Sequence, residues 1–246
     1  MLRKIIFGTV VAVDTMISAS LTVLLSFFPG TEKKIRKVEE YWARIMVFAA
    51  RLRVHTNLPE LDKNSNYIFV CNHQSHLDTP VLLSLFKDFQ PRFLAKDSLF
   101  RIPFLGKGMS KTGHFSVDRH NPRQGMRDMQ RAAEYLDQGE SLLVFPEGTR
   151  SEDGELQDFY TGVFIIALKS ANTRVVPLVI EGTRKILPKG RIGIEKNRDV
   201  YITGGSPVNV HQKYGLKERD RLKEDMRKLM EQMYSEIGEW KKQKRN

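Results

Sequence analysis

The stretch YIFVCNHQSHLDTPVLL, residues 67–83, decides the fold predicted for this chain. It opens with five apolar or aromatic residues (67–71), a run typical of a strand buried on both faces. A polar turn follows, and a second apolar run begins after Pro80. A strand, a turn and a helix in this order form the unit of a parallel α/β sheet, in which polar side chains at the strand ends carry the chemistry.

His73 and Asp78 lie in this turn, five residues apart. On a continuous helix that separation is about 140° of rotation, so the two side chains would not meet. They meet if the strand ends at Asn72 and a helix begins with Thr79 as N-cap and Pro80 as its first residue, which leaves Asp78 in the turn. A histidine oriented by a carboxylate is a suitable general base at neutral pH.

Two neighbours offer alternatives to this pair. His76 is closer to Asp78 in sequence and is a rival partner for it. Cys71 precedes His73 by two residues, but an unpaired cysteine is usually a small buried apolar residue, so it is not expected to act as a nucleophile. As the only cysteine, Cys71 also excludes an internal disulfide and favours a reducing compartment.

Beyond Thr56 the chain alternates between strand and helix patterns. Strands are expected at 67–71, 92–95, 114–117, 141–146, 174–182 and 201–205, and helices at 79–87, 121–139, 161–172 and 217–240. This alternation predicts one α/β domain over 56–246, with a mixed, largely parallel sheet flanked by helices. Segment 201–205 is expected to close the sheet, and Pro177 predicts an edge strand or a bulge.

Residues 1–55 differ in kind and are expected to form N-terminal membrane-associated helices. Residues 5–28 contain one charge, Asp14, and are long enough to cross a hydrocarbon core of about 30 Å. A cleavable signal peptide is the alternative, but Asp14 would interrupt its apolar centre. The same charge, with several Thr and Ser residues, leaves open whether the helix crosses the bilayer or enters one leaflet.

After Pro29-Gly30, residues 38–54 repeat apolar side chains three and four positions apart, as an amphipathic helix does. This second helix either lies against lipid headgroups or packs on the globular domain, and the pattern allows both.

The net charge of the chain limits the classes of partner that it can be expected to bind. It contains 40 Lys and Arg against 29 Asp and Glu, a net charge of +11. Such a chain attracts polyanions, among them nucleic acid, anionic lipid, phosphorylated substrates and acidic proteins. Because the N-terminal segment is apolar, we expect membrane lipid rather than nucleic acid.

A second polar cluster, FPEGTR at 145–150, follows a predicted strand. Gly148 permits a tight turn, and Arg150 can hold a phosphate through a forked, charge-assisted contact. An ordinary turn with a surface Glu–Arg ion pair is the alternative. Two more cations, Lys96 and Arg119, also follow predicted strands.

Together, the order and spacing of these segments resemble the glycerophospholipid acyltransferases typified by bacterial lysophosphatidate acyltransferase. The matching blocks are N-H-x-x-x-x-D at 72–78, a G-x-x-F-x-x-R-like block at 113–119, F-P-E-G-T-R at 145–150, a V-P block at 176–177, and the segment AKDSLFRIPFLG at 95–106. The likeness covers about residues 66–183. The second block departs from the pattern because its aromatic, Phe115, comes one position early.

The resemblance implies transfer of an acyl group from acyl-CoA or acyl-carrier protein to the sn-2 hydroxyl of lysophosphatidate, giving phosphatidate, at the cytoplasmic face of the inner membrane. It implies His73 as general base and Asp78 as the residue that orients it. The residues implied to bind the acceptor are Lys96, Arg119, Glu147, Gly148, Thr149 and Arg150. No cofactor or metal is expected, because direct transfer requires neither.

Three alternatives remain open from the sequence. The same chemistry on another acceptor, such as glycerol-3-phosphate, lysophosphatidylglycerol or another lysolipid, would use the same base. A thioesterase would direct that base at water. A non-catalytic membrane module would bind anionic lipid or nucleic acid through its charge and leave the His73–Asp78 pair without a role.

Overall fold

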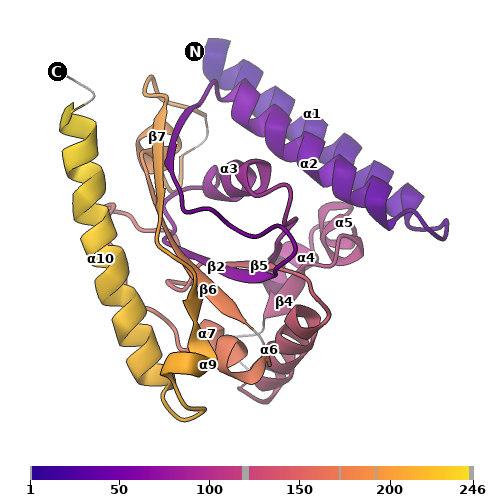
Figure 1. Cartoon of the computed structure of the whole chain (residues 1–246). Helices are drawn as coiled ribbons and strands as arrows, with labels where there is room; N and C mark the ends of the chain where they lie inside the picture. The colour runs from indigo at the N-terminus through magenta and orange to yellow at the C-terminus, as the bar shows by residue number, and fades with distance from the viewer. Residues whose placement is uncertain (1, 118–121, 172, 192, 244–246) are drawn as a thin grey trace.

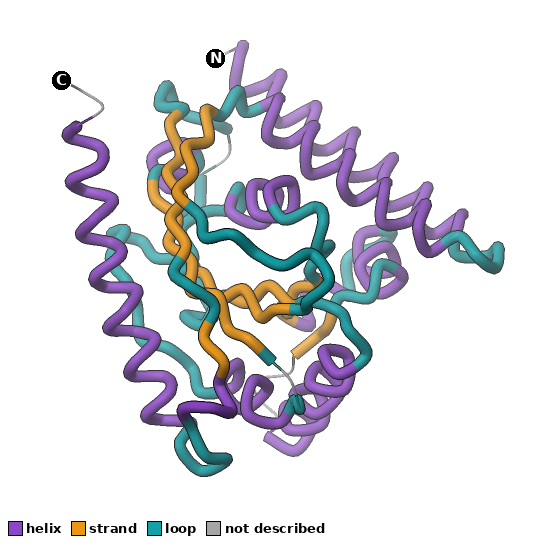
Figure 2. Tube along the Cα trace, in the orientation of Figure 1, coloured by secondary structure: helices purple, strands orange, loops and turns teal. Residues whose placement is uncertain are grey.

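A computed structural model describes residues 2–117, 122–171, 173–191 and 193–243. These residues form one eight-stranded sheet with helices on both faces (Figures 1 and 2). The strands are β1 (Arg53–Asn57), β2 (Tyr67–Cys71), β3 (Arg92–Lys96), β4 (Phe115–Val117), β5 (Leu142–Val144), β6 (Arg174–Glu181), β7 (Asp199–Gly204) and β8 (Val208–Asn209). The helices are α1 (Leu2–Leu25), α2 (Glu32–Ala49), α3 (Asp78–Leu85), α4 (Asp97–Phe100), α5 (Leu105–Lys111), α6 (Pro122–Asp137), α7 (Gly162–Lys169), α8 (Thr183–Ile186), α9 (Val210–Lys213) and α10 (Arg219–Gln243).

The strand order is β1-β7-β6-β2-β5-β3-β4, with β8 beside β6. Strand β6 is antiparallel to β7 and β8, and the remaining pairs are parallel. The predicted mixed, largely parallel sheet is therefore confirmed. The predicted boundary between residues 55 and 56 stays a prediction, and β1 lies across it.

Strand β2 is the centre of the molecule, with all five residues buried between β5 and β6. Its alternating side chains enter two different cores. Ile68 and Val70 pack with α6, α7 and α10, whereas Phe69 and Cys71 pack with α1 and α3 on the opposite face. Burial on both faces is why this strand has a continuous apolar sequence.

The chain leaves β2 and β5 in different directions. Helix α3 follows β2 on the face that carries α1 and α2, and α7 follows β5 on the face that carries α6 and α10 (Figure 1). The loops after two adjacent parallel strands therefore diverge, which leaves a crevice at their carboxyl ends. Such switch points are where open α/β sheets bind their ligands.

Helices α1 and α2 lie side by side as a hairpin over one face of the sheet (Figure 1). Residues 4–25 are long and apolar enough to cross a membrane. The hairpin is nevertheless attached to the domain at both ends, through ion pairs of Lys4 with Glu195 (2.7 Å) and of Arg36 with Glu140. In between, α1 packs so closely on α5 that a Cβ at Gly108 would lie 3.3 Å from the backbone of α1.

Two sequence predictions about this region are wrong. The amphipathic helix expected over 38–54 ends at Ala49, and the chain turns at Arg51 (φ 54°) into β1, which sequence analysis missed. Because β1 pairs with β7, segment 199–204 is an interior strand and does not close the sheet. Strand β1 is a half-exposed edge strand of mixed polarity (RVHTN), so it lacks the apolar run that revealed β2.

Of the two alternatives predicted for Pro177, an edge strand or a bulge, the edge strand is wrong, since β6 lies between β2 and β7. On one side of β6 the pairing is divided between β8, at 174–175, and β7, at 178–181. Pro177 lies at this break, where its carbonyl accepts a hydrogen bond from the Gly205 N–H at 2.9 Å. The break removes the need for an N–H at position 177, which proline cannot supply.

Candidate active site

His73 and Asp78 meet at the carboxyl end of β2. The Nδ1 of His73 lies 2.8 Å from Oδ2 of Asp78, which is fully buried. A carboxylate oxygen can only accept, so Nδ1 carries the proton and Nε2 keeps its lone pair. His73 lines a cavity, and the pair therefore has the arrangement of a general base and its orienting acid.

The pair forms in a different way from that expected. Helix α3 begins at Asp78, after Leu77, so Thr79 is not its N-cap. The Asp78 carboxylate turns back because Oδ2 also accepts the backbone N–H groups of Gln74 (2.6 Å) and Ser75 (2.8 Å). The two N–H groups thus stabilise the negative charge of Asp78 and close the turn, and the same carboxylate orients His73.

The FPEGTR loop, which follows the neighbouring strand β5, contacts His73 in several places. The Phe145 ring stacks on the imidazole, with centroids 4.0 Å apart and 16° between planes. The backbone N–H of His73 donates to Oε1 of Glu147 at 2.6 Å, and the backbone carbonyl of His73 accepts from the Ser151 N–H at 2.8 Å. Gly148 has φ 67°, a conformation that permits the tight turn expected there.

Glu147 lies behind the cavity and does not line it, since only 2% of its surface is exposed. Its second oxygen accepts the Gln157 N–H at 2.9 Å, so the carboxylate joins two loops to the turn that carries His73. Burial raises its pKa to about 7, although the hydrogen bonds from Gln157 and His73 partly oppose the shift. Its expected role in acceptor binding remains a prediction, and the contacts favour positioning of His73.

Two residues beside His73 also position the turn. Asn72 donates to the Ile180 carbonyl (3.0 Å) and accepts the Ile180 N–H (2.7 Å), which joins the ends of β2 and β6. Gln74 donates to the hydroxyl of Tyr234 on α10 at 2.6 Å. The sequence offered Asn72 only as a neighbour of His73, and nothing in it indicated Tyr234, which is 160 positions from Gln74.

The catalytic cavity, about 330 Å³, is the pocket that His73 lines. Its polar lining includes the side chains of Lys96, Thr149, Arg150 and Lys189. Lys189 was missed in the sequence, where no motif surrounds it. It reaches the cavity from the loop after α8 and pairs with Glu152 at 2.9 Å. The partial burial of Arg150 lowers its pKa from the usual value. The candidate Arg119 lies outside the described residues.

The rival residues take other positions. His76 is exposed at the wall of the cavity, and partial desolvation, with repulsion from Arg150 and His73, lowers its pKa to about 4. Asp78 bonds His73 and not His76. Cys71 is buried in the core under α3, and burial raises the pKa of its thiol, so no thiolate faces the cavity.

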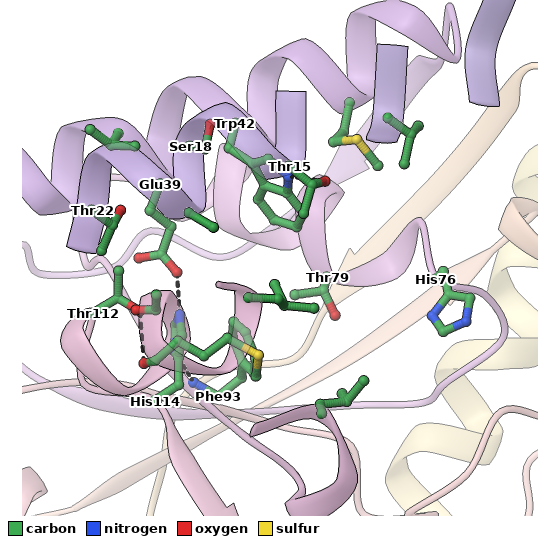
Figure 3. A pocket seen from close by; sticks show the side chains of 18 residues that line it. Thr15, Ser18, Thr22, Glu39, Trp42, His76, Thr79, Phe93, Thr112 and His114 are labelled. Carbon is green, nitrogen blue, oxygen red and sulfur yellow. Dashed lines mark hydrogen bonds and ion pairs between the residues drawn. The ribbon is translucent and has the colours of Figure 1, made fainter. Parts of the chain in front are cut away.

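A second, apolar cavity of about 330 Å³ lies beneath the hairpin, and we call it the hairpin chamber (Figure 3). Thr15, Ser18 and Thr22 of α1 face it, Glu39 and Trp42 of α2 cover it, and Thr112 and His114 form its floor. It shares four lining residues with the catalytic cavity, namely His76, Thr79, Phe93 and Leu99. An apolar chain in this chamber would therefore end beside His73.

Among the described residues, no group of three His, Cys, Asp or Glu side chains could hold a metal ion. The absence of a cofactor remains a prediction. The arrangement as it stands suits proton transfer at a site where cations and an apolar chamber converge.

Known proteins resemble the chain over most of its length. The chloroplastic 1-acyl-sn-glycerol-3-phosphate acyltransferase LPAT1 of Arabidopsis thaliana is 35% identical over 216 residues, which cover 85% of this chain and 59% of the relative. The 1-acyl-sn-glycerol-3-phosphate acyltransferase of Escherichia coli K12 is 27% identical over 215 residues, covering 86% and 84%.

A solved structure has the same fold. The crystal structure of the 1-acyl-sn-glycerophosphate acyltransferase PlsC from Thermotoga maritima superposes with a TM-score of 0.77 at 26% identity, covering 96% of this chain and 95% of that one. The family model named Acyltransferase matches residues 51–181, which hold β1 to β6 and the His73–Asp78 pair. Since that match covers more than half of the sequence, the chain belongs to the acyltransferase family.

Proposed function

We propose that this protein transfers an acyl group from an acyl thioester, of CoA or of acyl-carrier protein, to the sn-2 hydroxyl of lysophosphatidate. The observation that carries the proposal is His73, oriented by Asp78, in a cavity that Arg150, Lys189 and Lys96 make cationic and that adjoins an apolar chamber. The names of the relatives support a lysophosphatidate acceptor.

The geometry suggests a direct transfer. Nε2 of His73 accepts the proton of the acceptor hydroxyl while the oxygen of that hydroxyl attacks the thioester carbonyl carbon. The resulting tetrahedral intermediate collapses, the carbon–sulfur bond breaks, and the departing thiolate takes the proton back from the imidazolium. Asp78 holds the imidazole in the reactive tautomer and stabilises the cation that forms transiently. The products are a carboxylic ester and a free thiol, with no covalent enzyme intermediate.

The cations recognise the acceptor. Arg150 offers a planar fork suited to a phosphate, and Lys189 adds a second positive charge from the opposite loop. Glu152 and the Thr149 hydroxyl, at 2.9 and 3.5 Å from Nζ, hold Lys189 beside the cavity. Lysophosphatidate and glycerol-3-phosphate both present a phosphomonoester to such a site, whereas lysophosphatidylglycerol presents a more weakly charged diester.

The hairpin would place this site at a bilayer. The exposed face of α2 carries Tyr41, Ile45 and Phe48 at helical spacing, together with Arg44, as an interfacial helix does, and the exposed Arg51 follows in the turn after it. Because α1 packs on α5 and the hairpin is tied to the domain by Lys4 of α1 and Arg36 of α2, we propose that the hairpin lies in one leaflet and does not cross the membrane. The acidic, water-soluble donors favour the cytoplasmic face.

The test is a donor-by-acceptor matrix with the full chain purified in detergent. Acyl-CoA and acyl-carrier protein are each offered to lysophosphatidate, glycerol-3-phosphate, lysophosphatidylglycerol or no acceptor, and products are identified by mass spectrometry. We expect thiol release to depend on lysophosphatidate and to yield phosphatidate. Release without an acceptor would identify a thioesterase, and release with glycerol-3-phosphate alone would change the acceptor.

Arg150→Ala in the same assay tests phosphate recognition. Loss of a charge-assisted contact is expected to raise the KM for lysophosphatidate about ten- to a hundredfold. Arg221→Ala, an exposed cation on α10, is the control. An unchanged KM in Arg150→Ala would remove that residue from the acceptor site.

A further inference from the structure

A third cavity lies on the other side of the catalytic histidine. We call it the α6–α7 pocket; it is about 370 Å³ and lies between the first turns of α6 and α7. Its floor is apolar, formed by Met129, Val163 and Ile166, with Thr161 as a polar group and the exposed Met126 and Tyr160 at the mouth. The FPEGTR loop supplies part of its wall, but the proposed acceptor site does not account for it.

The catalytic cavity lies between this pocket and the hairpin chamber. The α6–α7 pocket shares Leu94, Ala95, Phe145 and Gly148 with the catalytic cavity, and Phe145 is the ring stacked on His73. Consecutive residues of β3 divide the two apolar spaces. Phe93 faces the hairpin side and Leu94 faces the α6 and α7 side, because side chains alternate along a strand.

The chemistry of a thioester explains why two such spaces would be needed. Its carbonyl carbon carries two substituents that diverge, the acyl chain on one side and the thiol arm on the other. If the carbonyl lies at His73 and the acyl chain fills the hairpin chamber, the sulfur and its arm point away from the hairpin. The α6–α7 pocket is the space found in that direction.

We infer that the α6–α7 pocket receives the phosphopantetheine arm of the acyl donor, an inference that rests on the proposed function. This arm is a flexible chain of methyl, methylene and amide groups, and the two methionines can adapt to it. Arg123 is exposed one helical turn before Met126, so a cation lies near the mouth, where the phosphate of the arm would emerge. The arm is common to CoA and acyl-carrier protein.

The acceptor's own chain is the competing occupant. The lysolipid resides in the bilayer, and the hairpin that would face the bilayer lies on the opposite side of the sheet from α6 and α7 (Figure 1). Its phosphate is assigned to Arg150 and Lys189 in the catalytic cavity. An acceptor chain in the α6–α7 pocket would extend from the catalytic cavity away from the hairpin, and so away from the membrane that the hairpin would face.

Gly162→Cys tests the inference without turnover. A side chain at Gly162 would point at Met129, whose Cε and Sδ lie 3.6 Å from an added Cβ, so the new thiol enters the pocket. The natural Cys71 is fully buried and gives little background. Maleimide labelling is followed by mass spectrometry with CoA, with a thioether analogue of acyl-CoA, with holo-acyl-carrier protein or with lysophosphatidate present.

At a donor concentration about ten times its Kd, labelling is expected to slow about tenfold by mass action. CoA, the analogue or the holo-carrier protein should protect position 162, and lysophosphatidate should not. Comparing CoA with the carrier protein identifies the source of the arm. Ser18→Cys, in the hairpin chamber, is the control; the thioether analogue should protect it, and CoA without an acyl chain should not.

Filling the pocket gives a second readout. Gly162→Leu should raise the KM for the donor about tenfold, a loss of about 1.4 kcal/mol, and leave the KM for lysophosphatidate unchanged. Gly238→Leu, on a surface of α10 where an added Cβ meets nothing within 4 Å, is the matched control.

Protection by lysophosphatidate, or by no ligand, would overturn the inference even if acyl transfer to lysophosphatidate is observed. Protection by CoA in a protein that does not acylate lysophosphatidate would leave the donor site standing and refute the proposed acceptor.

Discussion

At the scale of single residues, Asp78 bonds Nδ1 of His73, and among the described residues no hydrogen-bond partner engages Nε2. The carboxylate is itself fixed by two backbone N–H groups, so the imidazole is oriented by a group that cannot easily move. The Phe145 ring adds a flat apolar support on one face of the imidazole. An imidazole held in this way would lose little entropy if it acts as the base proposed above.

His73→Ala and Asp78→Asn are both expected to lower kcat, by about 10²–10⁴-fold, because the first removes the base and the second removes the charge that orients it. Asp78→Asn keeps the buried volume, so the fold should persist by circular dichroism. His211→Ala, on α9, is the control histidine. Full activity in either site variant would refute the assignment of the base.

The raised pKa of Glu147 predicts that the stability of the fold depends on pH. Its pKa is raised from an ordinary 4.5 to about 7, so between these values the folded chain holds a proton that the unfolded chain does not. The contribution of Glu147 to stability is therefore present below pH 4.5 and is lost as pH rises through about 7, a change of about 3 kcal/mol.

In Glu147→Gln this dependence should disappear, which urea unfolding at pH 5 and pH 8 would measure. The amide nitrogen of Gln cannot accept an N–H, so the variant should also be less stable at pH 5 than the natural chain. Equal pH dependence in both proteins would show that Glu147 is ionised throughout.

At the scale of elements, a buried polar cluster joins α2 to the sheet. Glu39 of α2 accepts from Arg92 of β3 at 2.9 Å and bonds Nε2 of His114, at the floor of the hairpin chamber (Figure 3). The Phe93 N–H donates to Nδ1 of His114, which places the histidine proton on Nε2, toward Glu39. Burial alone would raise the pKa of Glu39, but His114 and Arg92 hold it below its ordinary value.

Glu39→Gln is expected to cost about 3–5 kcal/mol, because it leaves the charge of Arg92 buried without its partner. The contribution of Glu39 is present above its unfolded pKa and falls on acidification, since its folded pKa is lowered. Trp42, which donates to Thr15 across the hairpin at 3.1 Å, reports the docking of α2 by fluorescence in a Trp240→Phe background.

Glu40→Gln is the matched control for this element. Its carboxylate pairs at 3.6 Å with the exposed Arg44 one turn further along α2, and loss of such an i,i+4 pair changes stability by about 0.5 kcal/mol or less. If Glu39→Gln were no more destabilising than Glu40→Gln, the cluster would not be what fastens the hairpin.

At the scale of the whole molecule, the exposed apolar side chains and the positive net charge both suit a membrane surface. Large apolar side chains are exposed along both hairpin helices, and at Ile102 and Phe104 in the loop between α4 and α5. Together with a net charge of +11, this surface suits an anionic bilayer. The opposite end of the molecule, near α9, is distant from the hairpin (Figure 1).

Phe48→Ala is expected to weaken binding to phosphatidylglycerol vesicles about ten- to a hundredfold, since Phe48 is 83% exposed and would lose its insertion into lipid. Leu216→Ala, 75% exposed near α9, should leave vesicle binding unchanged. Sedimentation with vesicles measures both. Equal effects of the two changes would place the membrane surface elsewhere.

The sequence by itself determined the alternation of elements, the identity of β2 and the candidates around His73 and FPEGTR. These features are local, because a strand buried on both faces is apolar throughout and a tight turn at positive φ favours glycine. The boundary of α2 and the existence of β1 were less accessible, since an edge strand buries little and carries no continuous apolar run.

Only the tertiary structure decided the rest. It brought Lys189 to the catalytic cavity, turned Glu147 away from it toward the His73 backbone, and placed apolar spaces on both sides of β3. Such facts depend on contacts between residues tens to more than a hundred positions apart, and on which face of the sheet each connection crosses. A local pattern specifies each element, but only packing determines which elements meet.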